Sequence, residues 1–381
     1  MHCFLLCKSP PGSDPYEKAK NIAVGQTIGT WIPVPGITDD MRRNYMGRII
    51  NIYDLEPDDL NRSISDQSEF QHYIFQIAYP TANFEDSIPL LLTTLLGNDA
   101  STSIQAKLID LYLPPQMLSR FPGPAYGVDG IRALCKVEKR PILLNMIKPC
   151  TGFTPDVGAR IFYDTALGGI DLIKDDELLG NPSYCPLAER IRAYNQASRA
   201  AFEKTGKETI YIPNITDHVS RLLDHAKTAQ EAGARIVMVN FAAVGFSALQ
   251  MLREQTELPI MGHYAGAGPY YEGPLSGVAS NLILGKLPRL LGTDIVMINT
   301  PYGGYPIKRS RYLRTVQELT LSLSDIRPAL PSCGGGVNPG MVETLIDDLG
   351  HDIILAPGGA IQGHPLGSRA GVRAMFAAIE A

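Results

Sequence analysis

The sequence predicts a parallel (β/α)8 barrel that follows a smaller α+β domain. From residue 141 onward, eight short apolar runs alternate with helical patterns over about 240 residues, the size typical of such a barrel. Before residue 113, strand and helix patterns do not alternate strictly, which favours a mixed or antiparallel sheet. We therefore predict a first domain over 1–112, a Pro/Gly-rich connection over 113–140 and the barrel over 141–381.

The first domain begins with an apolar strand over 3–7 and a helix over 15–25. Asp14 is a favourable N-cap for this helix, and Pro15 is well suited to its first position. Four further strands are predicted over 28–34, 48–54, 73–79 and 106–111, and a second helix over 86–97.

The barrel strands are the short apolar runs, predicted over 143–147, 171–173, 209–212, 235–239, 259–261, 294–298, 329–331 and 352–355. The helices after them are predicted over 156–167, 187–204, 217–232, 247–253, 277–291, 312–323, 341–349 and 368–379. The alternative is a doubly wound open sheet. None of these strands, however, precedes the full glycine fingerprint that such a sheet generally uses to bind a nucleotide.

Composition favours a soluble protein with a large core, because 45% of the residues are hydrophobic and 19% are charged. The net charge of −5, without a basic block, argues against nucleic acid as a partner. No apolar stretch is long enough to span a membrane, and the N-terminus does not resemble a signal peptide. The six scattered cysteines predict free thiols, so we expect a cytoplasmic protein.

The most informative segment is the end of the second barrel strand, where an apolar run leads into Lys174, Asp175, Asp176 and Glu177. Side chains alternate between the two faces of a strand, so Lys174 and Asp176 share one face while Asp175 points to the other. Glu177 begins the loop and is free to turn inward. A lysine and two carboxylates are therefore expected to converge at the end of this strand.

Oxygen-rich clusters of this kind suit Mg²⁺. A bare lysine would repel the metal, and Lys174 becomes a ligand only if its charge is inverted, for instance by addition of CO₂ to form a carbamate. The alternative interpretation is an ordinary surface salt-bridge cluster that follows a buried strand, and the residues alone leave both open.

Polar groups also follow the other predicted strands, at the barrel face where such enzymes place their chemistry. They are Lys148, Asn214, Asn240, His263, Asn299, the run 333–336 and the run 358–360. The glycines after strands seven and eight predict a phosphate site on backbone N–H groups, with Gly335, Gly336, Gly358 and Gly359 as candidates.

Several of these segments resemble the large chain of ribulose-bisphosphate carboxylase (RuBisCO). Residues 168–177, with Lys-Asp-Asp-Glu, resemble its activation motif, and Ile147-Lys148-Pro149 resembles its catalytic Lys-Pro segment. Gly29-Thr30-Trp31 resembles its N-terminal phosphate-contacting segment. Further matches, in the same order, are residues 79–80, 84–85, 97–98, 358–359 and 363–365. The resemblance spans nearly the whole chain.

The chain also departs from true carboxylases at positions that carry charge in the family. Cys150 replaces a lysine, Tyr264 an arginine and Met297 a histidine, and Gly304 stands at the position of the mobile-loop lysine. Gly25 aligns with the N-terminal glutamate. This pattern is similar to that of RuBisCO-like proteins, called form IV, and not to that of carbon-fixing enzymes.

The resemblance implies a ferredoxin-like N-terminal domain and a homodimer in which one subunit's N-terminal domain completes the other's barrel site. It implies that Lys174, as a CO₂ carbamate, binds Mg²⁺ together with Asp176 and Glu177. Lys148, with a depressed pKa, would shuttle protons, and His263 would orient or protonate a substrate oxygen. Asn98 would reach the substrate from the partner subunit.

The resemblance also implies one phosphate site, formed by Thr30, Trp31, Gly335 or Gly336, Gly358 and Gly359. The second family site has lost its cationic donors at Tyr264 and Met297, which predicts a monophosphate substrate. Each charge-assisted hydrogen bond lost there would cost about 1.5–3 kcal/mol.

The sequence therefore predicts an enzyme that forms an enolate of a phosphorylated keto-sugar or keto-acid. Within this class lie methionine-salvage enolases, isomerases of 5-methylthioribulose phosphate, and decarboxylases or transcarboxylase/hydrolases of branched sugar-acid phosphates. Salvage enolases carry a lysine at the position of Asn98, so asparagine counts against that activity. A catalytically idle phosphosugar-binding protein is the alternative, and a Schiff-base aldolase using Lys148 or Lys174 is a remoter one.

Overall fold

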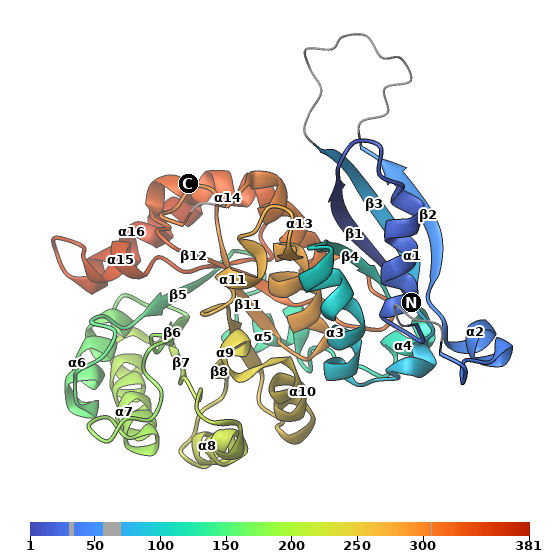
Figure 1. Cartoon of the computed structure of the whole chain (residues 1–381). Helices are drawn as coiled ribbons and strands as arrows, with labels where there is room; N and C mark the ends of the chain where they lie inside the picture. Colours follow the sequence, from blue (N-terminus) through green and yellow to red (C-terminus); the bar gives the residue numbers. More distant parts are fainter. Residues whose placement is uncertain (30–33, 56–69, 306) are drawn as a thin grey trace, which may run out of the picture. The chain divides into compact units, whose positions relative to one another are not determined.

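The computed structural model describes residues 1–29, 34–55, 70–305 and 307–381 (Figure 1). It divides into two compact units. The first contains Met1–Phe121 and Gly268–Ile283, and the second contains Pro122–Ala267 and Leu284–Ala381. The predicted strand at 28–34, and with it the candidate residues Thr30 and Trp31, falls largely outside the described residues.

The first unit is built on a five-stranded sheet in the order β10-β4-β1-β3-β2. β1 pairs antiparallel with both β3 and β4, and β2 pairs antiparallel with β3. The strands are β1 (His2–Ser9), β2 (Arg48–Asp54), β3 (Gln71–Ala78), β4 (Lys107–Tyr112) and β10 (Gly277–Val278). With helices α1 (Pro15–Gly25) and α3 (Ile88–Leu96), the order β-α-β-β-α-β is that of a ferredoxin-like domain.

Local sequence explains the main elements of this unit. Alternate residues of β1 are buried, so Cys3, Leu5 and Cys7 form its core face. The Asp14 side chain accepts a hydrogen bond from the backbone N–H of Tyr16 at 2.8 Å, which confirms its predicted role as N-cap. The remaining helices of the unit are α2 (Asp39–Tyr45), η2 (Thr81–Asn83), η3 (Asp99–Ser103), α4 (Pro115–Leu118) and α11 (Gly268–Tyr271).

The second unit is an eight-stranded parallel barrel with the strand order β7-β6-β5-β13-β12-β11-β9-β8. The strands are β5 (Ile142–Met146), β6 (Leu172–Lys174), β7 (Ile210–Ile212), β8 (Val237–Asn240), β9 (Ile260–His263), β11 (Ile295–Asn299), β12 (Leu330–Gly334) and β13 (Ile354–Leu355). A parallel bridge between Asn214 and Met238 joins the two ends of the sheet. The predicted (β/α)8 barrel is confirmed.

Except for the first, which precedes β5, the helices of the barrel unit follow its strands along the chain (Figure 1). They are α5 (Gly127–Cys135), α6 (Pro155–Ala166), α7 (Leu187–Thr205), α8 (Val219–Glu231), α9 (Phe241–Val244), α10 (Phe246–Gln255), α12 (Leu287–Leu290), α13 (Arg309–Thr320), η5 (Pro339–Met341), α14 (Val342–Leu349), α15 (Gly358–Gln362) and α16 (Ser368–Glu380). The π-helical turn η4 (Asn281–Lys286) lies at the junction of the two units in the chain.

One predicted helix, over 277–291, is wrong at its beginning. Gly277 has a φ of +81°, which is unsuited to a helix interior. It pairs instead with Lys107, so that Gly277 and Val278 form the strand β10 beside β4. Helical structure begins only at Asn281.

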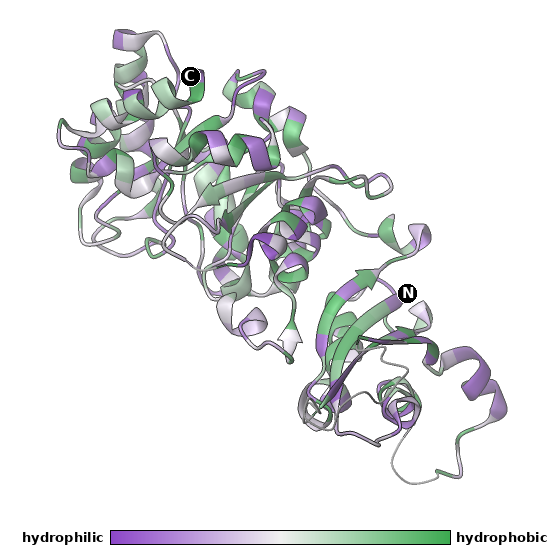
Figure 2. Ribbon diagram, turned by 90° about the horizontal axis from the view of Figure 1, so that it is seen from above, coloured by the Kyte–Doolittle hydropathy of each residue, from purple (hydrophilic) through white to green (hydrophobic). Residues whose placement is uncertain are grey.

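The barrel interior is apolar. Alternate strand residues such as Leu144, Leu172, Ile212, Met238 and Met297 are buried and pack together. Figure 2 shows the hydrophobic colouring along the strands of both sheets. A filled interior leaves the strand ends as the place for a site. Among the described helices, none combines the length and the apolar character needed to cross a bilayer.

Candidate active site

The predicted activation segment lies at the carboxyl end of β6 and is buried. Lys174 is the last residue of the strand and has 0% exposure, and Asp176 has 1%. The Lys174 Nζ donates a hydrogen bond to the Asp175 carbonyl oxygen at 2.9 Å and lies 3.7 Å from the Glu177 Oε2. The alternative of a surface salt-bridge cluster is therefore wrong, because the side chains of Lys174 and Asp176 are withdrawn from solvent.

Burial determines the protonation of Lys174. Removal from water disfavours the ammonium form and lowers the pKa of Lys174 below its usual range, although the nearby Glu177, Asp176 and Asp175 charges act in the opposite direction. A larger fraction of neutral amine is the consequence. The neutral amine is the form that adds CO₂.

Lys148 follows β5 and faces the same cluster. Its Nζ lies 2.6 Å from the Asp176 Oδ2 and 3.0 Å from the Cys150 Sγ. Burial by itself would lower the pKa of Lys148, but the hydrogen bonds and charges of Asp176 and Cys150 outweigh it and raise the pKa above its usual range. The depression expected from a nearby metal cation stays a prediction; in the structure the Lys148 ammonium is paired with the Asp176 carboxylate.

His263 ends β9 and completes the cluster. Its Nε2 lies 3.5 Å from the Glu177 Oε2, and its Nδ1 accepts a hydrogen bond from the Ala265 backbone N–H at 3.2 Å. Burial, and next the charge of Lys174, lower the pKa of His263 well below its usual range. The imidazole is therefore neutral. Because Nδ1 accepts, the proton lies on Nε2, which can donate to a carboxylate or a substrate oxygen.

Two asparagines hold the turn that carries the carboxylates. The Asn214 side chain, after β7, donates to the carbonyl oxygens of Asp176 at 3.3 Å and Glu177 at 3.0 Å. The Asn240 side chain, at the end of β8, donates to the Glu177 carbonyl at 2.9 Å. These residues, predicted only as polar strand ends, fix the backbone of the turn. The Asn240 Oδ1 is buried without a partner among the described residues.

Tyr264 and Met297 occupy positions that carry cations in true carboxylases. The Tyr264 hydroxyl donates to the Asn299 Oδ1, and its ring stacks on His263 with centroids 5.0 Å apart. Met297 is 2% exposed and belongs to the barrel core. Neither side chain can provide a cationic donor for a second phosphate.

The glycines after β12 and β13 are required for different reasons. Gly335 and Gly336 have φ values of +78° and +108°, and a Cβ on Gly358 would lie 1.8 Å from the Met146 Sδ. Backbone conformation or packing thus requires glycine at these three positions. A Cβ on Gly359 would meet nothing within 4 Å, so its backbone faces open space. This is the position where a bound group has room.

Asn98 lies in the first unit, directly before η3, and is exposed. With Gln26 it lines a hollow of about 340 Å³. The Gln26 side chain donates to the carbonyl oxygens of Thr93 and Thr94 at 3.2 and 3.0 Å, so it holds the end of α3.

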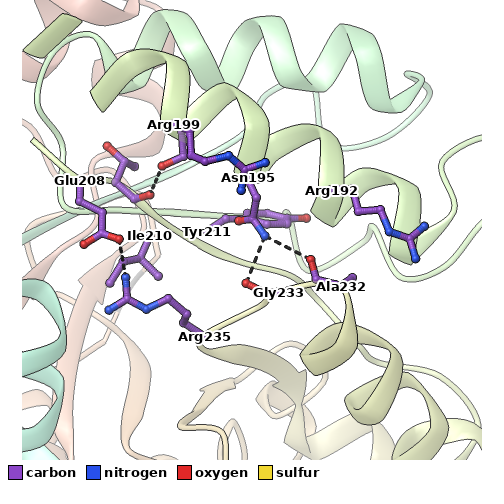
Figure 3. A pocket seen from close by; sticks show the side chains of 11 residues that line it. Arg192, Asn195, Arg199, Glu208, Ile210, Tyr211, Ala232, Gly233 and Arg235 are labelled. Carbon is purple, nitrogen blue, oxygen red and sulfur yellow. Dashed lines mark hydrogen bonds and ion pairs between the residues drawn. The ribbon is translucent and has the colours of Figure 1, made fainter. Parts of the chain in front are cut away.

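A second hollow, of about 360 Å³, lies where β7 and β8 begin, so it is not part of this cluster (Figure 3). An ion pair of 2.7 Å between Glu208 and Arg235 lines it. The Asn195 amide donates to the carbonyl oxygens of Ala232 and Gly233. None of the predicted site residues lines this hollow.

Arg190 and Tyr211 were missed by sequence reasoning. Both contact the Asp175 carboxylate, at 3.0 Å from the Arg190 Nη2 and 2.7 Å from the Tyr211 hydroxyl. Neither stands at a strand end, and an arginine on a helix generally faces solvent. The only signal was Asp175 itself, a carboxylate on the outward face of a buried strand, which requires a partner.

The fold and the site together define a class, a RuBisCO-type protein with an N-terminal α+β domain and a catalytic barrel. Residues 2–117 match the N-terminal domain of the ribulose bisphosphate carboxylase large chain, and residues 127–381 match its catalytic domain. The chain belongs to this family, and within it to the RuBisCO-like proteins of form IV, not to the true carboxylases.

Individual relatives cover nearly the whole chain. It is 40% identical to a ribulose bisphosphate carboxylase-like protein of Archaeoglobus fulgidus, over 98% of this chain and 85% of that one. It is 38% identical to the 2,3-diketo-5-methylthiopentyl-1-phosphate enolase of Geobacillus kaustophilus, over 97% and 89%. A solved rubisco-like protein (MtnW) from Alicyclobacillus acidocaldarius matches with a TM-score of 0.90 and 34% identity, over 100% and 93%.

Proposed function

We propose that the protein is a Mg²⁺-dependent RuBisCO-like enzyme that forms an enolate of a phosphorylated keto compound. The observation that carries this proposal is the buried Lys174 beside Asp176 and Glu177, at the end of a barrel strand. A buried amine of lowered pKa next to two carboxylates is costly for the fold, and such perturbed groups concentrate at functional sites.

The donor set fits a Mg²⁺ site completed by CO₂. Among the described residues, His, Cys, Asp and Glu form no cluster of three that would bind a metal without help. A carbamate on Lys174 would add the missing oxygen ligands to those of Asp176 and Glu177. When bound, Mg²⁺ supplies Lewis-acid stabilisation of the enediolate.

The other residues of the cluster have separable roles in this proposal. Lys148 keeps its proton while Asp176 lies 2.6 Å away, and it can accept a substrate proton only after that pairing is released. His263, neutral with its proton on Nε2, orients a substrate oxygen by donating a hydrogen bond. Lys148 is therefore our candidate proton shuttle and His263 our candidate orienting group.

The substrate is proposed to be a monophosphate. Gly335, Gly336, Gly358 and Gly359 would hold its phosphate on backbone N–H groups, together with Thr30 and Trp31. Tyr264 and Met297 leave the far end without cations, which supports a smaller, apolar or carboxylated group there.

The relative named as an enolase of 2,3-diketo-5-methylthiopentyl 1-phosphate supports enolisation of a keto monophosphate. Asn98 stands where the salvage enolases carry a lysine, so the proposal is kept at the level of the reaction class. Isomerisation and decarboxylation or transcarboxylation-hydrolysis of sugar-acid phosphates begin with the same enolate and belong to that class.

We further propose a homodimer with shared sites, as in the family. A cytoplasmic location is proposed as well. It is supported by the six cysteines, all of which are free in the structure, as expected in a reducing compartment.

The test is exchange of the proton next to the substrate carbonyl with deuterium from D₂O, followed by NMR on a panel of ketose and diketo monophosphates. We expect exchange that requires both Mg²⁺ and CO₂ and that is lost in Lys174→Ala. Binding of the same compounds without exchange would instead indicate an idle phosphosugar-binding protein. Inactivation by borohydride in the presence of substrate would indicate a Schiff-base aldolase.

A further inference from the structure

Arg190, on helix α7, is a buried cation with four different partners. Its side chain has 0% exposure. The Nη1 donates to the Cys185 carbonyl at 2.6 Å and the Nη2 to the Gly180 carbonyl at 2.8 Å. The Nε and Nη2 also donate to the Asp175 Oδ2, at 3.2 and 3.0 Å, and the Nε lies 3.0 Å from the Tyr211 hydroxyl.

Among Asp175, Asp176 and Glu177, only Asp175 points away from the metal-ligand cluster. Its Oδ1 accepts from the Tyr211 hydroxyl at 2.7 Å, and its Oδ2 accepts from the Asn214 backbone N–H at 2.9 Å as well as from Arg190. Asn214 is the residue whose side chain holds the carbonyls of Asp176 and Glu177. Asp175 therefore binds the backbone of Asn214, and the Asn214 side chain in turn holds the turn of Asp176 and Glu177.

These contacts enclose the ligand turn from both sides. Arg190 binds the side chain of Asp175 before it and the carbonyl of Gly180 after it, and both candidate ligands, Asp176 and Glu177, lie in between. A planar guanidinium can donate to several acceptors in fixed directions, which a lysine ammonium cannot reproduce.

We propose that Arg190, together with Asp175 and Tyr211, is a positioning device that fixes the turn of Asp176 and Glu177 for Mg²⁺ binding. This inference rests on the proposed metal site. Asp175, Arg190 and Tyr211 bind one another, and Arg190 also binds the backbone at Gly180, so in this proposal they act through the backbone that carries the ligands. Supports of this kind typically contribute about 10–100-fold to metal affinity.

A milder change to this positioning device can be made at Tyr211. Tyr211 lines the hollow at the start of β7 (Figure 3). Its hydroxyl bonds to Asp175 and Arg190. Tyr211→Phe removes the hydroxyl and keeps the ring, so the barrel packing is preserved.

The experiment is calorimetric titration of the full-length protein with Mg²⁺ in bicarbonate buffer, with ¹³C NMR of the Lys174 carbamate as a second readout. We expect Arg190→Lys to weaken Mg²⁺ binding by about 10–100-fold. Tyr211→Phe should weaken it less, in the same direction. Both variants should retain a native circular dichroism spectrum, and Tyr211→Phe decides the question if Arg190→Lys does not fold.

The matched control is Arg289→Lys. Arg289 is 1% exposed and donates to four backbone carbonyls, those of Glu318, Leu321, Ile326 and Arg327, none of which belongs to the ligand turn. It should lose thermal stability without losing Mg²⁺ affinity. Unchanged Mg²⁺ affinity in the Arg190 and Tyr211 variants, or an equal loss in Arg289→Lys, overturns the positioning role. A wild-type protein that binds no Mg²⁺ overturns the metal site itself.

Discussion

At the scale of single residues, the decisive feature is that the fold withdraws Lys174 from water. A lysine at a strand end on the surface would remain charged and unreactive toward CO₂. Burial lowers the pKa of Lys174, and the negative charges of Glu177 and Asp176 offset only part of this effect. The site therefore gains reactivity at the expense of the stability of the metal-free protein.

Because the Lys174 ammonium is buried, we predict that the wild type and a variant without this lysine differ in their free energy of unfolding, and that the difference depends on pH. The pKa of Lys174 is lower in the folded protein than its ordinary value of 10.5, so the folding penalty is complete below the folded pKa and disappears as the pH rises toward 10.5. In the presence of a chelator, Lys174→Met should raise the free energy of unfolding at pH 7, because it removes the buried ammonium. The advantage should shrink as the pH rises from the lowered pKa of folded Lys174 toward 10.5.

Urea denaturation across this pH range measures the difference. Methionine has a similar length and volume, so loss of packing is small. A Lys174→Met protein that is less stable than the wild type at every pH would show that the ion pair with Glu177 outweighs the burial penalty.

At the scale of secondary structure, the loops after β12 and β13 show that similar glycine motifs can require glycine for different physical reasons. Gly335 requires its glycine because its φ is +78° and a Cβ would lie 2.7 Å from the Tyr305 ring. Gly359 has no such requirement within its own chain. The proposed phosphate site would explain the glycine at position 359, because a side chain there would occupy the space of the phosphate.

Gly359→Ala should therefore weaken phosphate binding without a matching loss of stability. We expect its free energy of unfolding to change by no more than about 0.5 kcal/mol, while affinity for inorganic phosphate falls. Gly335→Ala is the comparison, and it should lose about 1–2 kcal/mol of stability because alanine is strained at positive φ. Thermal denaturation and phosphate titration measure the two effects. Undiminished phosphate binding by Gly359→Ala would place the phosphate elsewhere.

At the scale of the whole molecule, the candidate residues are divided between two units. Asn98 belongs to the first unit, and Lys174, with its carboxylates, belongs to the second. In the proposed dimer, the partner subunit's N-terminal domain would complete each site. The isologous symmetry of a two-fold dimer would then give two identical sites, each assembled from both chains.

Mixed dimers provide the test of this shared site. In a hybrid of Asn98→Ala and Lys174→Ala chains, one site carries both changes and the other carries neither. With equal mixing and free exchange, about half of the dimers are hybrids, so about a quarter of all sites should recover activity. Activity is measured on isolated hybrids after both variants have been shown to fold. Hybrids no more active than their parents would mean that each chain completes its own site.

By itself, the sequence determined the barrel, its eight strands and most of the residues that gather at their ends. The periods of apolar residues are local, and the end of each parallel strand has a fixed place in a barrel. The helix predicted at 277–291 is wrong at its beginning because Gly277 pairs with Lys107, a partner 170 positions away in the chain.

Only the tertiary structure decided how the site residues are charged and held. The hydrogen bond from Lys148 to Asp176, at 2.6 Å, raises the pKa of Lys148 against the effect of burial, whereas complete burial lowers the pKa of Lys174. Arg190 resembles an exposed helix residue in the sequence, yet it binds both sides of the ligand turn. Protonation and positioning depend on distances and burial between residues far apart in the chain, which no local pattern of residue types contains.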